Sequence, residues 1–354
     1  MAANGRSAPP TLEEVAALAG VGRGTVSRVV NNAPGVKEAT RVLVQQAIDR
    51  LGYVPNRAAR ALAGSRSDAV ALVIAESARR FFTEPFFSDI VHGVTAGLAD
   101  TEMQLLLTLV RGDKERQRFV QYARAGRVDG VLLVSVHDDE PLPDLLAELD
   151  VPTVLSGRRR SDESVSYVDS DNVGGARAAV RHLAGSGRRA IATIAGPLDM
   201  YGARCRLRGY REEMREVFGR EPDPAWTARG DFTEESGRRA TRELLERHPG
   251  LDAVFAASDV MAAGALQVLR AAGRRVPEDV AVVGFDDSPI AQHTDPRLTT
   301  VRQPVEEMGR AMARVLMESI DERGAAAGSG AGTGAGTAWR HVILRTELVR
   351  RASA

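Results

Sequence analysis

The sequence comprises 354 residues, of which 44% are hydrophobic; this is the composition of a folded protein, and the length predicts two or three domains. Basic and acidic side chains both number 47, so the net charge of zero does not indicate a nucleic-acid partner. A single cysteine excludes an internal disulfide, and neither a secretion signal nor an apolar run of about 18 residues is present. We therefore expect a cytoplasmic protein without a membrane span.

The charge is unevenly distributed along the chain. The first 67 residues carry nine basic and four acidic side chains, a net charge of +5, so the remainder is net acidic. A basic segment joined to an acidic body is the asymmetry expected of a nucleic-acid-binding head.

The segment 11–20 is predicted to form a short helix. Thr11 and Glu14 have the spacing of a capping box, in which the threonine hydroxyl accepts from the third backbone N–H and the glutamate reaches back to the cap. Apolar residues recur from Leu12 at i, i+3, i+4 and i+7, and Gly20 supplies the left-handed residue that ends a helix.

Two further helices are predicted, from about Gly22 to Val30 and from about Val36 to Leu51, each with an apolar stripe. Short helices separated by Gly-Val form a helix-turn-helix, whose second helix enters the major groove of DNA. The outward residues of that second helix are cations and small hydrogen-bonding side chains: Arg23, Thr25, Ser27, Arg28 and Asn31. The alternative from spacing alone is a three-helix bundle with a solvated polar face.

Three segments narrow this choice: TLEEVAALAGV at 11–21, TVSRVVN at 25–31 and GYVPNRAARALA at 52–63. Together they resemble the DNA-binding head and hinge of the lactose-repressor (LacI) family of bacterial transcriptional regulators. The resemblance implies a head at 1–54, a hinge at 55–67 whose helix forms on the operator, and an effector-binding domain at 68–354.

The resemblance also implies the DNA contacts. Arg23, Gly24 and Arg28 would take the base-reading positions, and Leu62 would be the wedge that kinks the central minor-groove step. The remaining members of the DNA-binding set are Thr11, Thr25, Ser27, Asn31, Tyr53, Asn56, Arg57 and Ala59.

The chain departs from the family pattern in the head. Gly24 offers no side chain to a base and weakens its helix by about 1 kcal/mol relative to alanine, so Arg23 and Arg28 must carry most of the direct readout. Gly22 and Lys37 stand where helix-capping hydroxyls are usual, a substitution that costs only a few tenths of a kcal/mol for glycine.

The body is predicted to be α/β. Continuous apolar runs alternate with helical segments, which is typical of parallel sheets covered on both faces. The runs lie at 69–74, 104–107, 130–134, 153–155, 190–194, 253–256 and 280–284. The length accommodates two such subdomains of periplasmic-binding-protein type, with the ligand in the cleft between them. A Gly/Ala-rich flexible loop is expected at 324–337, before a last strand around 341–344.

The family resemblance extends through the body, for example in AGP at 195–197, RLRGY at 206–210 and VGFDD at 283–287. It implies that Arg206 and Asp286 hold polar groups of an effector, since a guanidinium and a carboxylate suit vicinal hydroxyls or the edge of a base. The other implied effector-binding residues are Phe86, Phe87, Phe232, Ser258 and Gln303.

Enzymatic sites find little support in the sequence. Neither lysine follows the glycine that a P-loop requires, and the six histidines are scattered without metal-ligand spacing. Adjacent Asp286 and Asp287 at a strand end are expected to point in different directions and so do not form a catalytic pair. We expect no enzyme activity, no cofactor and no metal.

The residues and the resemblance together predict a homodimeric repressor that binds a palindromic double-stranded operator and is released by a small sugar. A nucleobase co-repressor that strengthens binding is the alternative within the same class. A solute-binding protein is the alternative from another class, and the basic head and missing signal sequence argue against it.

Overall fold

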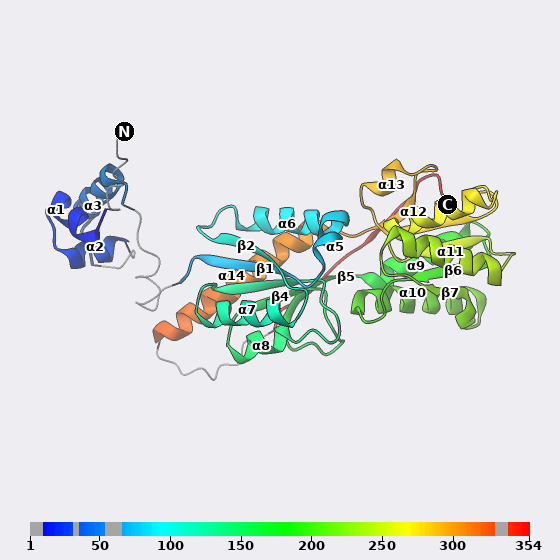
Figure 1. Ribbon diagram of the computed structural model, residues 1–354, viewed down its shortest axis with the longest axis horizontal. Helices are drawn as coiled ribbons and strands as arrows, with labels where there is room; N and C mark the ends of the chain where they lie inside the picture. Colours follow the sequence, from blue (N-terminus) through cyan, green and yellow to red (C-terminus); the bar gives the residue numbers. More distant parts are fainter. Residues whose placement is uncertain (1–9, 31–34, 54–65, 330–338) are drawn as a thin grey trace, which may run out of the picture. The chain divides into compact units, whose positions relative to one another are not determined.

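The computed structural model describes residues 10–30, 35–53, 66–329 and 339–354 (Figure 1). It divides into two units, Met1–Ser67 and Asp68–Ala354. The hinge positions Asn56, Arg57, Ala59 and Leu62, and also Asn31, lie outside the described residues.

The described head contains helices α1 (Leu12–Ala19), α2 (Arg23–Val30) and α3 (Glu38–Leu51). The capping box is present: the backbone N–H of Glu14 donates to the Thr11 hydroxyl, and the Glu14 carboxylate accepts from the Thr11 backbone N–H at 2.7 Å. Gly20 ends α1 in the left-handed conformation. The predicted apolar faces meet in one small core, built around the buried Val15, Val26 and Val44.

The body has two halves, each with a mainly parallel sheet between layers of helices (Figure 1). The sheet of the first half has the order β11-β5-β4-β3-β1-β2. Its elements are β1 (Ala69–Ile74), α5 (Ala78–Thr83), α6 (Pro85–Leu98), β2 (Gln104–Leu109), α7 (Asp113–Arg124), β3 (Gly130–Val134), α8 (Leu142–Glu148), β4 (Thr153–Ser156), β5 (Ser166–Ser170), α14 (Val305–Ser329) and β11 (His341–Leu344).

The sheet of the second half has the order β12-β10-β9-β8-β6-β7, in which only the β10–β12 pair is antiparallel. Its elements are α9 (Asn172–Gly185), β6 (Ile191–Ala195), α10 (Tyr201–Phe218), the 3-10 turn Pro224–Trp226, β7 (Thr227–Arg229), α11 (Glu234–Arg247), β8 (Ala253–Ala256), α12 (Asp259–Ala271), β9 (Ala281–Asp286), α13 (Ile290–His293), β10 (Thr299–Arg302) and β12 (Glu347–Val349).

Strand β1 shows why the central strands read as unbroken apolar runs. Val70, Leu72 and Ile74 pack toward α6 and α14, whereas Ala71 and Val73 pack toward α7 and α8. Both faces of the strand are therefore covered, and no position is left for a polar residue.

The chain crosses between the halves three times: from β5 to α9, from β10 to α14 and from β11 to β12. Each half therefore contains non-contiguous segments, and three crossing segments connect the two halves. This arrangement allows the two halves to move as bodies about a few residues.

Two expectations for the end of the chain were wrong. Helix α14 continues to Ser329, so residues 324–329 are helical rather than part of a loop. Alanine has the highest helix propensity, and extending an existing helix avoids the cost of nucleation. The strand at 341–344 is also not the last, because β12 follows it in the other half.

Candidate functional site

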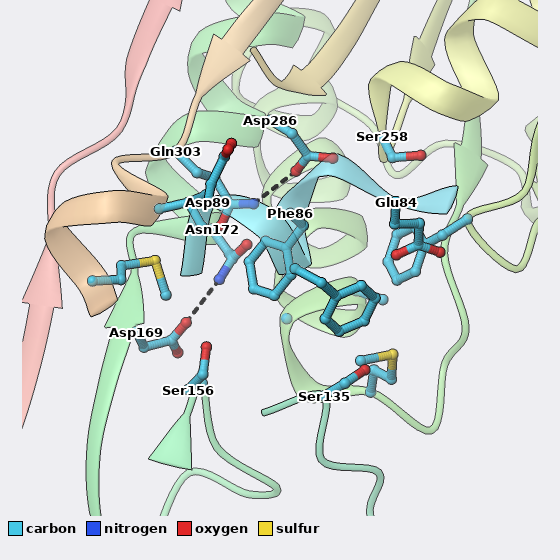
Figure 2. Close-up of a pocket in the computed structure, with 18 of the residues that line it drawn as sticks. Glu84, Phe86, Asp89, Ser135, Ser156, Asp169, Asn172, Ser258, Asp286 and Gln303 are labelled. Carbon is cyan, nitrogen blue, oxygen red and sulfur yellow. Dashed lines mark hydrogen bonds between the residues drawn. The ribbon is translucent and has the colours of Figure 1, made fainter. Parts of the chain in front are cut away.

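A cavity lies between the two halves, at the carboxyl ends of their strands. Figure 2 shows polar side chains from both halves converging on it, among them Asp169 and Ser156 from the first half and Asp286 and Ser258 from the second. All seven side chains that the family resemblance assigned to an effector line this one cavity: Phe86, Phe87, Arg206, Phe232, Ser258, Asp286 and Gln303.

Arg206, on α10, is held from three directions at the floor of the cavity. Its Nε donates to Asn172 Oδ1 at 2.8 Å, and its Nη1 donates to the Ala257 carbonyl at 2.5 Å and to Asp286 Oδ1 at 3.2 Å. The guanidinium also lies 3.8 Å from the centroid of the Phe285 ring. These contacts pre-organise the guanidinium, which lowers the entropic cost of ligand binding.

Gln303 continues this network toward the first half. Its amide nitrogen donates to Asp286 Oδ1 at 2.7 Å, and its carbonyl oxygen accepts from the Ser170 hydroxyl at 2.6 Å. Asn172 donates in turn to Asp169 Oδ1 at 3.0 Å (Figure 2). The network reaches the crossing segments, so a ligand that contacts Asp286 would be connected to them through Gln303.

Burial sets the electrostatics of the floor. It raises the pKa of Asp286, against the opposing effect of Arg206, and it lowers the pKa of Arg206, which Asp286 and Asp169 partly counter. Burial likewise raises the pKa of Asp169, which Arg158 opposes with a hydrogen bond at 3.0 Å. A guanidinium and a carboxylate in a desolvated site each favour a polar ligand that can form hydrogen bonds with them.

Two residues at the cavity wall have strained backbone conformations. Phe232 has φ of 68° and Asp286 has φ of 115°, a region that residues other than glycine rarely adopt. Such conformations cost about 1–3 kcal/mol and cluster at ligand sites. Phe232 presents its ring to the cavity, and its ring lies 5.4 Å below the guanidinium of Arg80.

Phe86 and Phe87, at the start of α6, differ in their placement. Phe86 is half-buried and faces the cavity, as Figure 2 shows. Phe87 also lines the cavity but is 1% exposed and belongs mainly to the core of the first half. Ser258 caps α12 by accepting from the Met261 N–H at 3.3 Å.

Sequence reasoning missed many of the polar side chains that line the cavity, which come from both halves of the body. Arg80 donates to Glu84 Oε1 at 2.6 Å, and both side chains line the cavity. Burial raises the pKa of Glu84 to about 7, against the opposing effect of Arg80. Further polar and aromatic lining residues that were not predicted are Asp89, Ser135, Ser156, Arg158, Asp169, Asn172 and Tyr201. These residues come one or two at a time from different helices, strands and loops, so no periodic pattern singles them out.

In the head, Arg23 and Arg28 are exposed on α2, and Gly24 is exposed between them. The Arg23 side chain is 73% exposed and makes an ion pair with Glu13 at 3.1 Å. Thr25 and Ser27 are partly exposed on the same helix, and Thr11 is exposed at the cap of α1.

Tyr53 lies just after the end of α3. Its ring is only 8% exposed and packs into the head core, because the chain turns back after Gly52 and the Tyr53 N–H donates to the Ile48 carbonyl at 3.1 Å. The ring therefore has a role in the head core, and the assignment of Tyr53 to the DNA-binding set stays a prediction.

Adjacent Asp286 and Asp287 separate as expected. Asp286 faces Arg206 and Gln303, whereas Asp287 accepts from Arg302 at 2.8 Å and from Arg351 at 2.5 Å. Two carboxylates directed to different partners do not form a catalytic dyad.

Comparison with known proteins agrees with this geometry. Residues 11–56 match the family described as bacterial regulatory proteins, lacI family, and residues 180–354 match the periplasmic binding protein-like domain. The chain is 55% identical over 313 residues to the HTH-type transcriptional regulator CelR of Thermobifida fusca, covering 88% of this chain and 92% of that protein. The chain belongs to the lacI family of bacterial regulatory proteins.

Other members of the lacI family are also similar. The ribose operon repressor of Escherichia coli (strain K12) is 35% identical over 314 residues, covering 88% of this chain and 93% of that protein. A solved CelR–cellobiose complex has a TM-score of 0.75 at 50% identity, covering 98% and 100% of the two chains. A lac repressor dimer bound to operator and an anti-inducer has a TM-score of 0.79 at 28% identity, covering 98% and 99%.

Membership of the lacI family makes the chain a DNA-binding transcriptional regulator rather than an enzyme. Within the described ranges, no helix combines the length and apolar character that a bilayer crossing requires. The described part of the chain also contains no group of three histidine, cysteine or acidic side chains placed to hold a metal ion.

Proposed function

We propose that this regulator represses transcription as a cytoplasmic homodimer on a palindromic operator, and that cellobiose or a closely related glucose disaccharide releases it. The observation that carries the sugar proposal is the pairing of the Arg206–Asp286 floor with the Phe232 and Phe86 walls in one cleft. Charged side chains suit vicinal hydroxyls, and aromatic faces pack against the C–H surface of a sugar ring.

The relative CelR supports a disaccharide in particular. Its structure is that of a cellobiose complex, and it aligns with 98% of this chain. The cleft also extends beyond the floor to Arg80 and Glu84, so polar groups are available at both ends of an elongated ligand.

The DNA-binding proposal depends on two parts of the chain, helix α2 of the head and the hinge segment 55–67. Arg23 and Arg28 are both exposed on α2, where they could make base and phosphate contacts. Leu62, which lies outside the described residues, is proposed as the minor-groove wedge; Leu62→Ala should reduce operator bending and affinity while sparing effector binding.

The test is a fluorescence-anisotropy titration of the purified protein on promoter fragments from its own and neighbouring genes. Cellobiose should weaken operator binding in a saturable manner, whereas ribose should not. If a purine strengthened operator binding, the effector would be a nucleobase co-repressor rather than a sugar. Absence of any fragment shift at low salt would refute the DNA-binding proposal.

A further inference from the structure

Beside the effector cavity, the two halves of the body are joined directly by ionic contacts. His137 lies in the loop after β3 of the first half, and Asp199 lies in the loop after β6 of the second half. His137 Nδ1 is 2.7 Å from Asp199 Oδ2. None of the three crossing segments contains either residue, so the contact forms only when the halves approach each other.

The imidazole is held on its other side by its own half. His137 Nε2 is 3.3 Å from Glu76 Oε1, in the loop between β1 and α5. With an acceptor at each ring nitrogen, only the doubly protonated imidazolium can donate to both. The hydrogen bond to Glu76 raises the pKa of His137, burial opposes it, and Asp199 raises it further, to about 9.

A second contact lies next to the first but does not depend on a histidine. The Asp138 backbone N–H donates to the Asp199 carbonyl at 2.9 Å, and the Asp138 carboxylate accepts from Arg204 of α10 at 2.8 Å. Arg204 also donates to the Arg159 carbonyl at 2.8 Å. The second contact therefore serves as a built-in control for the first.

The histidine contact is connected to the cavity wall through charged side chains. Glu76 accepts from Arg80, and it also accepts from the Ser135 hydroxyl at 2.9 Å. Arg80 donates to Glu84 at 2.6 Å, and Arg80, Glu84 and Ser135 all line the cavity. A ligand that changes the position of Arg80 would thus change the charge that His137 experiences.

We propose that His137 and Asp199 form a protonation-dependent latch that holds the cleft closed over its effector, and that Arg80 links this latch to the cavity wall. The latch would regulate the same site as the proposed function, and its sugar-dependent part rests on that function. Its ligand is the same sugar, and its effect is on the closed state rather than on direct sugar contact.

The sign of the pH dependence follows from the charged groups around His137. These are Glu76 and Arg80 from the first half and Asp199 from the second, with Asp138 and Arg204 alongside. Opening withdraws Asp199, so the pKa of His137 is lower in the open form than in the closed form. Closure is therefore fully supported at lower pH and loses this support as the pH rises through about 9.

The first experiment measures cellobiose affinity of the full-length protein by calorimetry between about pH 8 and about pH 10, above the pKa of about 7 of Glu84. The wild type should lose about 2- to 5-fold in affinity over this range, since a partly exposed ion pair has this value. His137→Gln should bind weakly at both pH values, with no slope. Arg204→Gln, the matched control, should weaken binding but keep the wild-type slope. The proposal would be overturned if the cellobiose affinity of His137→Gln depended on pH as strongly as that of the wild type. It would also be overturned if the affinity of the wild type did not depend on pH.

The second experiment needs no sugar and so separates failure of the latch from failure of the proposed function. The pKa of His137 is measured by NMR titration in the wild type and in Asp199→Asn, with His137→Gln used to assign the resonance. The pKa should fall in Asp199→Asn. An unchanged value would show that Asp199 does not contact His137 and would overturn the proposal, whereas absence of cellobiose binding with a lowered pKa would overturn the choice of sugar alone.

Discussion

Arg206 on α10 and Asp286 at the end of β9 meet at 3.2 Å across the floor of the cleft, although 80 positions separate them in the chain. Asn172 and Gln303 hold the two side chains from the sides. The pair therefore presents a fixed charged surface to a ligand.

Replacing Arg206 with alanine should abolish the response to effector while leaving operator affinity without effector unchanged, because the head is a separate unit. A buried carboxylate that loses its cation costs about 3–5 kcal/mol, so the body should also melt at a lower temperature. Anisotropy with and without cellobiose measures the response. Arg208→Ala, exposed on the same helix, is the matched control, and a retained response in Arg206→Ala would place the effector elsewhere.

Replacing Arg23 with alanine should cost about 1–3 kcal/mol in operator affinity and relax specificity at one base pair of each half-site. The reason is that Arg23 is exposed at the start of α2, next to a glycine that offers no side chain to a base. Binding to a set of single-base operator variants measures this. Equal weakening on every variant, as expected for the exposed Arg50→Ala if it touches only phosphate, would reassign Arg23 to the backbone.

Replacing Glu84 with glutamine should change how stability depends on pH. Burial raises the pKa of Glu84 to about 7, so the folded protein holds this proton more tightly than the unfolded chain does. The stabilising contribution of this proton to the free energy of unfolding is fully present below pH 4.5 and is lost as the pH rises through about 7. Glu84→Gln should therefore gain stability relative to the wild type above pH 7, on the order of 2–3 kcal/mol. Melting temperatures are measured for both proteins at each end of this pH range. An equal difference between the two proteins at both ends would contradict the burial of a titrating carboxyl at Glu84.

Replacing Gly93 with alanine should destabilise the first half of the body. A methyl group there would lie 2.2 Å from the Glu306 carbonyl oxygen, so α6 and α14 would have to separate. Overpacking of this kind costs about 1–3 kcal/mol. Gly185→Ala at the end of α9 is the control, because its methyl group would meet open space, and it should be neutral or slightly stabilising. Equal melting temperatures for the two variants would show that the helices yield without cost.

Local features of the fold could be predicted from the sequence because their information lies within a few residues. The Thr11–Glu14 capping box and the left-handed Gly20 were confirmed, as were the bounds of β1, β3 and β8. Strands β5, β7, β10 and β12 were not predicted, because they are short or contain polar residues and so have no continuous apolar run.

The sequence by itself determined the capped helices of the head, the doubly covered strands and, through family resemblance, the seven side chains that share the cleft. Only the tertiary structure decided that Tyr53 packs inward, that α14 extends to Ser329, and that Arg80, Glu84 and His137 join the neighbourhood of the site. Periodicity reports which face of an element is apolar, whereas the meeting of charged loop residues depends on how three chain crossings bring the two halves together.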